Sequence, residues 1–499
     1  MHLNMLLEMV SGGLDDRVLF GTQSDGVTAA DLAAGARRVG AWLAAQPGNA
    51  VGFVDLNSEA LPLSFFGCGV AGKAFVPCNY RLTDEQLRSL LVRIAPATVI
   101  VGDTTHDRLS GIDGVRLVHR SELLAVAAAP PAPEADLVVG DPDEIAVLLY
   151  TSGTTGEPKA AVLRHRNLAA YILSSVEYAS AGGAECAIVS VPPYHIAGVS
   201  SVLSSSFAGR RVVYVEAFDA AEWVRLARAE SVTHAMVVPT MLSRILDALE
   251  DGRGLPALRT LSYGGGPMPL PVIERALRML PDVGFVNAYG LTETSSTIAL
   301  LGPDDHRAAM ESEDPEVRAR LGSVGRPLPT LEVSIRDLDG RPLPPGERGE
   351  IWVRGEQVSG EYLGRTAGPD DGWFRTRDGG HLDAGGYLFV HGRLDDVIVR
   401  GGENLSPGEI EQVLAEHPAV RAAGVVGIPD EDWGEQVVAA VTLADGRITS
   451  EEELRQFVQA RLRSAKTPTH IQIRDELPFN EMGKLLRRVL RSELTEAYG

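Results

Sequence analysis

Apolar residues along the first third of the chain follow two alternating patterns. Over residues 28–46 and 83–94 they recur at helical spacing, and each stretch begins with a threonine that can cap a helix. Residues 61–72 are apolar, rich in small side chains, and also predict a helix. Short apolar runs between these segments predict strands at 51–54, 74–77 and 98–101. Strands that alternate with helices predict a parallel sheet covered on both faces.

The same alternation continues to about residue 290. Helices are expected at 167–177 and 220–229. Strands are expected at 145–150, 187–191, 211–215, 235–239, 258–262 and 284–289. Three of these strands run into turns rich in glycine or hydroxyl residues, and ligands of open α/β sheets sit beyond the carboxyl ends of strands. We therefore expect the binding site along that edge.

The pattern changes near residue 322, where short segments with strand periodicity are split by Gly, Pro and Asp. Strands at 332–336, 349–353 and 387–390 predict a small antiparallel β-subdomain. Beyond Asp395 an α+β unit is expected. Its helices cover 407–416, capped by Ser406, and 451–463, capped by Ser450, and its strands cover 421–427 and 437–443. The predicted fold is α/β, with a large domain of doubly wound parallel sheets plus the β-subdomain at 1–394 and a small domain at 395–499.

Composition narrows the class of protein. At 499 residues the chain is too long for one core, and its net charge of −21 disfavours nucleic acid or an anionic membrane as a partner. The three cysteines have no paired spacing, which indicates a reducing, cytoplasmic setting. No signal peptide and no apolar run of about twenty residues is visible, so no membrane span is expected.

The segment Tyr150-Thr-Ser-Gly-Thr-Thr-Gly-Glu-Pro-Lys159 combines features that suit a polyphosphate. Glycines let backbone N–H groups approach an anion, hydroxyls add donors, and Lys159 adds a mobile positive charge. It is not a Walker A loop, because its glycines are only two residues apart and Lys159 follows a proline. A plain polar surface loop is the alternative interpretation.

With this loop and the segments Asn287–Glu293 and Gly483–Arg487, the sequence resembles the adenylate-forming superfamily over nearly its whole length. That superfamily contains acyl- and aryl-CoA ligases, luciferases and peptide-synthetase adenylation domains. The resemblance implies that the loop holds the pyrophosphate end of ATP, through Thr151, Ser152, Gly153, Thr154, Thr155, Gly156 and Lys159. It also implies that Gly264, Gly265, Gly266 and Pro267 line the adenine and carboxylate sites; a plain glycine turn is the alternative.

The segment Asn287-Ala288-Tyr289-Gly290-Leu291-Thr292-Glu293 offers an aromatic ring, a hydroxyl and a carboxylate. The ring of Tyr289 could stack on a purine, Thr292 could contact phosphate, and Glu293 could hold Mg²⁺, which prefers a few oxygen ligands plus phosphate. A tight turn with a solvated glutamate is the alternative. The segment matches the superfamily's adenine and magnesium motif closely, which favours the functional interpretation.

Three further side chains match positions with roles in the superfamily. Asp378 and Arg393 match the residues that hold the ribose, and Lys484 matches a lysine that bridges the attacking carboxylate and the α-phosphate. Positive charge placed where negative charge builds up lowers the barrier. Each of these residues taken singly is more often a surface charge. Where the superfamily has glycine, this chain has Arg377 before Asp378.

The acid and its acceptor are less well defined. His195 resembles a residue that borders the acyl-carboxylate site, which Gly264 and Gly290 would also line; a structural histidine is the alternative. The acceptor tunnel would involve Gly401, Gly402, Glu403 and Trp433, opened by rotation of the small domain about Asp395. Only Lys466 and His470 are candidates for the nucleotide of CoA.

We therefore expect an enzyme that uses ATP and Mg²⁺ to convert a carboxylic acid to an acyl-AMP and then passes the acyl group to a nucleophile. CoA is the first expectation, followed by an amine, a carrier-protein thiol and oxygen. A non-catalytic ATP or acyl-AMP binder is the alternative from another class. Pocket segments 192–207, 239–245 and 263–268 carry no obvious charged residue, which favours an apolar aryl or acyl acid. The protein is expected to act as a monomer or homodimer.

Overall fold

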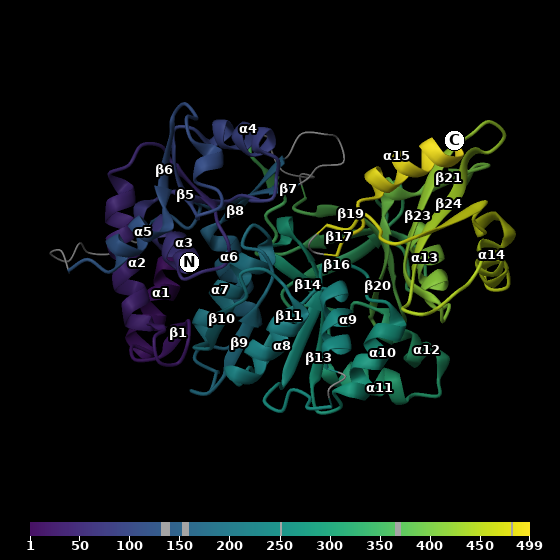
Figure 1. Ribbon diagram of the computed structural model, residues 1–499, viewed down its shortest axis with the longest axis horizontal. Helices are drawn as coiled ribbons and strands as arrows, with labels where there is room; N and C mark the ends of the chain where they lie inside the picture. The colour runs from purple at the N-terminus through teal and green to yellow at the C-terminus, as the bar shows by residue number, and fades with distance from the viewer. Residues whose placement is uncertain (131–139, 152–158, 250–251, 365–370, 481–482) are drawn as a thin grey trace.

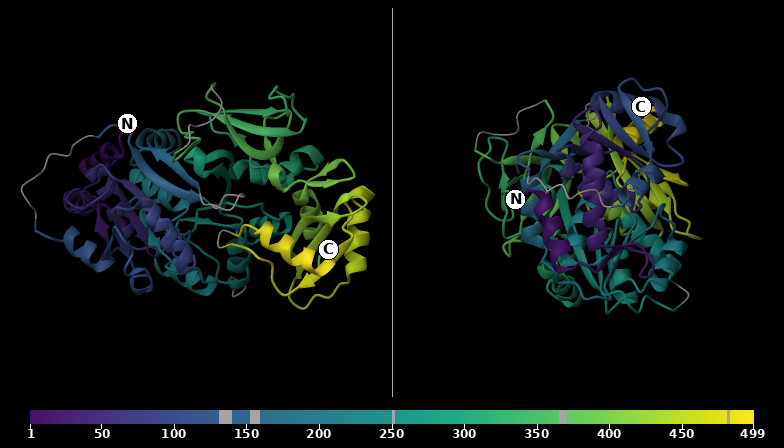
Figure 2. Two further views of the ribbon diagram at one scale, coloured as in Figure 1. Left: turned by 90° about the horizontal axis from the view of Figure 1, so that it is seen from above. Right: turned by 90° about the vertical axis from the view of Figure 1, so that its left-hand side faces the viewer.

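The computed structural model describes residues 1–130, 140–151, 159–249, 252–364, 371–480 and 483–499. Helices near the N-terminus lie at one end of the molecule and the C-terminal elements at the other (Figures 1 and 2). The helices are α1 (Leu3–Gly13), α2 (Ala29–Ala44), α3 (Ala60–Ala71), α4 (Asp84–Ile94), α5 (Arg120–Ala127), α6 (His165–Ser175), α7 (Ile196–Ala208), α8 (Ala220–Ala229), α9 (Pro239–Ala248), α10 (Leu270–Met279), α11 (Pro303–Glu311), α12 (Pro315–Ala319), α13 (Pro407–Ala415), α14 (Glu451–Gln459) and α15 (Arg487–Tyr498).

Two doubly wound sheets form the large domain, as the alternating pattern predicts. The first has the order β18-β8-β7-β4-β3-β5-β6 and is parallel from β7 to β6. Its strands are β3 (Ala50–Val54), β4 (Ala74–Pro77), β5 (Ala97–Val101), β6 (Val115–His119), β7 (Ile145–Thr151), β8 (Lys159–Arg164) and β18 (Glu361–Tyr362).

The second sheet has the order β15-β14-β13-β12-β11-β9-β10-β1-β2 and is parallel from β13 to β1. Its strands are β1 (Val18–Phe20), β2 (Val27–Thr28), β9 (Cys186–Val189), β10 (Arg211–Tyr214), β11 (His234–Val237), β12 (Thr260–Gly264), β13 (Gly284–Leu291), β14 (Ser296–Leu301) and β15 (Arg326–Pro327). One apolar core packs the two sheets together, and a second core packs α4 against the first sheet.

The predicted β-subdomain is a separate antiparallel sheet of order β16-β17-β19-β20. Its strands are β16 (Glu332–Arg336), β17 (Gly349–Arg354), β19 (Phe374–Leu382) and β20 (Leu388–Arg393). The small domain follows with its own cores, one of which contains Ile410, Val441 and Leu454. Its strands are β21 (Ile398–Arg400), β22 (Glu403–Leu405), β23 (Val420–Asp430), β24 (Gly434–Leu443) and β25 (His470–Arg474). Asp395 lies in the short segment between β20 and β21, which suits the predicted boundary.

The helix caps test the local predictions. Thr28 and Thr83 each form a capping box with the residue three positions on, and the hydroxyl of Ser450 accepts from the backbone N–H of Glu453. Ser406 occupies the N-cap position of α13, as predicted, but its side chain makes no capping bond, because its hydroxyl donates to the carbonyl of His391 in the β-subdomain. Helix α6 begins two residues earlier than predicted, since the side chain of Asn167 accepts from the N–H of Arg164.

No helix among the described residues is long and apolar enough to cross a membrane.

Candidate active site

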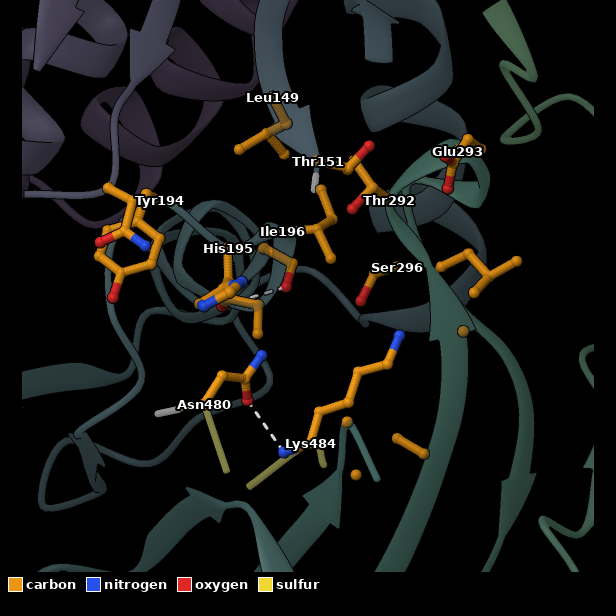
Figure 3. A pocket seen from close by; sticks show the side chains of 18 of the residues that line it. Leu149, Thr151, Tyr194, His195, Ile196, Thr292, Glu293, Ser296, Asn480 and Lys484 are labelled. Carbon is orange, nitrogen blue, oxygen red and sulfur yellow. Dashed lines mark hydrogen bonds between the residues drawn. The ribbon is translucent and has the colours of Figure 1, made fainter. Parts of the chain in front are cut away.

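A cleft of about 2150 Å³ opens where the large domain meets the small domain. Figure 3 shows Thr151, Thr292 and Glu293 on one side of the cleft, His195 on another, and the side chain of Lys484 pointing into it. Gly264, Gly265, Ala288, Gly290, Lys159 and Arg393 also line it. The carboxyl ends of β7, β12 and β13 therefore converge on the cleft, as expected for an open α/β sheet.

Glu293 lies in a single helical turn, η2 (Thr292–Thr294), directly after β13. Its carbonyl accepts from the backbone N–H groups of Ser359 and Gly360 at 2.9 and 3.1 Å, which fixes the turn from outside. Its carboxylate accepts a hydrogen bond of 2.5 Å from the hydroxyl of Tyr362. The ammonium group of Lys159 lies 6.0 Å from the centroid of the Tyr362 ring. Tyr362 thus connects the residue predicted for Mg²⁺ with the lysine predicted for phosphate.

This arrangement fits a magnesium ion that is bound together with phosphate. Mg²⁺ is usually held by one or two carboxylates plus phosphate oxygens and waters. Glu293 supplies such a carboxylate at the edge of the cleft, and among the described residues no group of three or more His, Cys, Asp or Glu side chains is placed to form an all-protein metal site. The remaining oxygen ligands would come from the nucleotide.

Asp378 and Arg393 face each other on paired positions of β19 and β20. Asp378 is 5% exposed and accepts from the hydroxyl of Tyr289 at 2.6 Å and from Arg393 at 3.2 Å. Burial raises the pKa of Asp378, and the charges of Arg393 and Lys484 oppose that rise. The three residues assigned to the nucleoside by resemblance therefore lie together, although they are far apart in the sequence.

Arg377 shows how this site depends on backbone geometry. It adopts a φ of +60°, the left-handed conformation that glycine occupies without cost, so the chain keeps a glycine-type turn with an arginine in it. Its side chain reaches Asp395 at 3.5 Å. The arginine at this position therefore contacts the predicted hinge.

Lys484 enters the cleft on a tight turn. The backbone N–H of Lys484 donates to the side chain of Asn480 at 2.9 Å, and Gly483 has a φ of +65°. A β-carbon on Gly483 would lie 2.7 Å from the hydroxyl of Thr240 on α9. Glycine thus allows the turn to rest against the large domain, which brings Lys484 to the same cavity as Glu293 (Figure 3).

His195 precedes α7 at the carboxyl end of β9 and lines the cleft. Burial lowers its pKa to about 4, so its imidazole is neutral at pH 7. Its ring lies 4.7 Å from that of Tyr194. A neutral ring here can shape the cavity or exchange hydrogen bonds, but it supplies no positive charge.

Some of the predicted site residues do not line the cleft. The amide of Asn287 donates to the carbonyl of Ser323, a structural contact. Gly266, Pro267, Tyr289, Gly401, Gly402, Glu403 and Trp433 are not among the residues that line the cavity; Trp433 is 56% exposed, and Tyr289 reaches the site through its bond to Asp378. Ser152, Gly153, Thr154, Thr155 and Gly156 fall outside the described residues.

Tyr362 and Asn480 were not predicted as site residues, and no helix was predicted over α7, although residues 192–207 were expected to line the acid pocket. Tyr362 acts through a contact between segments 69 residues apart. Asn480 lies four residues before Lys484, within reach of a turn, and this spacing was the one usable signal. Helix α7 was not predicted because serine and glycine interrupt its apolar pattern.

The cleft of this two-domain α/β fold brings together Lys159, Glu293, the Asp378–Arg393 pair and a lysine from the small domain, which are the groups predicted for a nucleotide-dependent activating enzyme. Residues 10–363 match the sequence profile of the AMP-binding enzyme family, and residues 409–484 match that of the AMP-binding enzyme C-terminal domain. The chain therefore belongs to the AMP-binding enzyme family and is an ATP-dependent, AMP-forming ligase.

Named relatives and solved structures agree with this assignment. The chain is 35% identical over 471 residues to a feruloyl-CoA synthase from Amycolatopsis sp., covering 93% of this chain and 91% of that protein. The o-succinylbenzoate CoA synthetase (MenE) of Bacillus subtilis, solved with ATP and magnesium ion, aligns with a TM-score of 0.83 and 30% identity over 97% of this chain and 98% of that one. The same enzyme has been solved with its acyl-adenylate intermediate OSB-AMP.

A third similar structure is that of an enzyme named as an amide bond synthetase. The amide bond synthetase McbA from Marinactinospora thermotolerans aligns with a TM-score of 0.86 and 27% identity, over 98% of this chain and 99% of that one. The same architecture thus occurs in ligases that are named for two different acceptors.

Proposed function

We propose that this protein adenylates an uncharged aryl or acyl carboxylic acid and then transfers the acyl group to CoA. In the first step a carboxylate oxygen attacks the α-phosphorus of ATP, the new P–O bond forms, and the bond to the bridging oxygen breaks. Pyrophosphate leaves with the electron pair, and acyl-AMP remains. Thr151 and Lys159, which line the cleft, would contact the departing phosphates, and Glu293 would hold Mg²⁺, which would supply neutralising charge.

The observation that carries this proposal is the position of Lys484. It belongs to the small domain, yet its side chain lies in the large domain's cleft, which Glu293 and Thr292 line (Figure 3). Two anions must meet in the reaction, so a cation at that place favours the transition state more than the separated reactants. Asp378 and Arg393 provide an acceptor and a donor for ribose hydroxyls. The neutral His195 borders the carboxylate site with Gly264 and Gly290.

Transfer to CoA requires a second arrangement of the small domain. The β21–β22 hairpin, with Gly401, Gly402 and Glu403, and the nearby Trp433 lie on the surface outside the cleft. Rotation about Asp395 would withdraw Lys484 and bring this hairpin to the acyl-adenylate. Closure around a mixed anhydride also limits its hydrolysis.

Two contacts favour an amine as the second candidate acceptor. Lys466 is bound to Glu409 at 2.6 Å, and the ring of His470 stacks on Tyr498 at 4.6 Å. Both residues that the sequence analysis named as candidates for binding the nucleotide of CoA therefore already contact other residues of the small domain. An amine acceptor needs no nucleotide site.

The deciding experiment incubates the enzyme with Mg-ATP and a panel of aryl and aliphatic acids, and measures acid-dependent pyrophosphate exchange. Each active acid is then given CoA or a simple amine, and the products are identified by mass spectrometry. Thioester that requires CoA supports CoA transfer, whereas amide without thioester replaces it with the amine candidate. Absence of exchange with every acid would contradict adenylation, and exchange that persists in Lys484→Ala at the wild-type rate would contradict the role of Lys484.

We also infer that the enzyme acts in the cytoplasm. Cys68, Cys78 and Cys186 are buried and carry free thiols, and burial raises the pKa of all three. Proteins with several free cysteines and no disulfide are typical of reducing compartments. Fractionation of the native host, with immunodetection of the chain, tests this location.

A further inference from the structure

The cleft continues past the adenylation site along one face of the second sheet. His234, Ala235 and Met236 on β11 and the alternate residues Thr260 and Ser262 on β12 line the cavity. Their neighbours Val237, Leu261 and Tyr263 do not line it and are at most 1% exposed in the core. This period of two on β12 shows that the channel is built into the sheet, because successive side chains of a strand point to opposite faces.

Helix α7 forms the opposing wall of this channel. It begins after His195 and its N-terminal end lies at the carboxyl edge of the sheet, so it runs back toward the amino edge before β10 begins. Ser200, Ser201, Ser204 and Ser205 line the cavity, and their spacing places them on one side of the helix. The wall opposite the sheet is therefore a row of small hydroxyl side chains.

Two independent measures give the depth of the channel. On β12, Thr260 lies four residues before Gly264, which corresponds to about 13 Å of strand. On α7, Ser205 lies nine residues after Ile196, which corresponds to about 14 Å of helix. His234 pairs with Thr260 in the sheet, so it lies at the same depth. The channel thus has room for an elongated acid whose far end reaches His234 and Ser205.

The hydrogen bonds around His234 define what its ring offers. Nδ1 lies 2.8 Å from the hydroxyl of Thr233 and 3.7 Å from the carboxylate of Glu185. The Thr233 hydroxyl also accepts from the backbone N–H of Cys186 at 3.0 Å and lies 3.1 Å from the carbonyl of Cys186. Nδ1 is therefore engaged by the protein, and Nε2 is the ring nitrogen that can exchange a hydrogen bond with a ligand.

The charged groups at this end of the channel are two arginines that share one carboxylate. Arg210, which lines the cavity, donates through Nε to Glu185 at 3.2 Å, and Arg259 lies 3.7 Å from the same carboxylate on the exposed side. Burial, and then the charge of Arg210, lower the pKa of His234 to about 4, so its ring is neutral at pH 7. The end of the channel therefore combines a neutral imidazole, small hydroxyls and a paired arginine.

We propose that the acid substrate is elongated and carries a hydrogen-bond donor, such as a phenolic or terminal hydroxyl, at the end remote from its carboxylate, and that Nε2 of His234 accepts from that donor. This inference rests on the proposed adenylation of an uncharged acid and narrows the class of that acid. The positive charge of Arg210 is already paired, which disfavours a second carboxylate at this end. A bare hydrocarbon end would leave the polar groups here without partners, and sites built around a substrate hydroxyl reject analogues that lack it.

The test measures binding without chemistry, so that it does not depend on adenylation. Arylalkanoic acids with spacers of increasing length are titrated into the enzyme by calorimetry without ATP, each as a 4-hydroxyphenyl, a 4-methylphenyl and a 4-carboxyphenyl compound. The hydroxyl and methyl groups are similar in size, so their Kd ratio at the best spacer isolates the hydrogen bond. We expect the hydroxyl compound to bind about tenfold more tightly in the wild type.

Variants of His234 then identify the acceptor. His234→Phe keeps an aromatic ring without the acceptor nitrogen and is expected to reduce the ratio to about one, whereas His234→Gln retains an acceptor oxygen and should restore part of it. His106→Leu, a histidine at the exposed surface, is the matched control and should keep the wild-type ratio. The thermal transition of each variant reports whether it folds.

Several outcomes would overturn the inference: a wild-type ratio of one or less, tightest binding by the 4-carboxyphenyl acid, no binding by any acid, or an unchanged ratio in a folded His234→Phe. The wild-type ratio alone decides the matter if the variant does not fold. Pyrophosphate exchange with the same acids reports separately on the proposed function. Preferential binding of the hydroxyl acids without pyrophosphate exchange would support the proposed hydroxyl recognition and contradict adenylation. Pyrophosphate exchange without that preference would support adenylation and contradict the hydroxyl recognition.

Discussion

The two ends of the cleft are built on different principles. At the nucleotide end, charged side chains from three parts of the chain meet: Glu293 after β13, the Asp378–Arg393 pair of the β-subdomain, and Lys484 of the small domain. At the end that we propose for the acyl group, a channel between β11–β12 and α7 is lined mostly by neutral side chains of the large domain, with Arg210 paired to Glu185 at its far end. The nucleotide end is assembled from three separate parts of the fold. The acyl end lies within the large domain, between one sheet and one helix.

The difference follows from what each end has to do. Negative charge moves during adenylation, so the nucleotide end needs fixed charges and a cation that can be brought in and withdrawn. The acyl end only has to fit the acyl chain and bind one polar group, and the side chains of a rigid sheet are suited to this. Changes at the nucleotide end should therefore affect rate, and changes at the acyl end should affect selectivity.

The largest expected effect comes from Lys484→Ala. Removing a preorganised cation from the transition state commonly costs about 10²–10³ in kcat, and we expect that loss in pyrophosphate exchange with little change in the Kd of the acid. Arg461→Ala, on the exposed surface of the small domain, is the control and should retain the wild-type rate. A Lys484→Ala enzyme that loses acid binding and keeps its rate would reverse the assignment of the two ends.

Asp378→Asn should weaken nucleotide binding by an intermediate amount. The substitution removes a buried carboxylate that accepts from both Tyr289 and Arg393, and charged hydrogen bonds contribute about 1.5–3 kcal/mol, so KM for ATP should rise about tenfold or more. Tyr289→Phe removes only one of these bonds and should have the smaller effect. Steady-state kinetics with ATP varied at saturating acid measure both. Equal effects of the two variants would show that Asp378 serves only to position Tyr289.

The neutral imidazole of His195 should make stability depend on pH. Its pKa in the folded protein is about 4, below the usual value of 6.5. Between these two pH values, His195 binds a proton in the unfolded chain but not in the folded protein. Stability from this group is complete above pH 6.5 and falls as the pH drops toward 4, by about 1 to 2 kcal/mol between pH 7 and pH 5. His195→Phe should flatten that slope in urea titrations at the two pH values. An equal slope in the variant would mean that His195 is charged in the folded protein.

Arg377→Gly should have the smallest effect. Glycine removes the strain of the left-handed conformation, worth about 1–2 kcal/mol, but it also increases the freedom of the unfolded chain, so we expect a net gain of up to about 1 kcal/mol. Arg377→Ala keeps the strain and loses the contact with Asp395, and should therefore be the less stable variant. Thermal unfolding of the two variants compares them directly. A more stable alanine variant would show that backbone strain is absent at this turn.

Local patterns were sufficient for much of the fold and for the residues of the nucleotide end. Helix α8 and strands β4 and β16 have the bounds that periodicity predicts, because each buries one face or both at a regular spacing. Lys484, Glu293, Asp378 and Arg393 were predicted because the short segments around them resemble motifs of the adenylate-forming superfamily. Their roles remain predictions that the variants above test.

Contacts between distant segments decided the rest. Tyr362 reaches Glu293 across 69 residues, and Ser406 donates to His391 of another domain instead of capping its own helix. The acyl channel had no motif, since its walls come from separate strands and from one side of α7. The sequence by itself determined which chemical groups are present and which segments form strands and helices, because those depend on neighbours along the chain. Only the tertiary structure decided which of these groups share a cavity, because that depends on the register and packing of segments far apart in the chain.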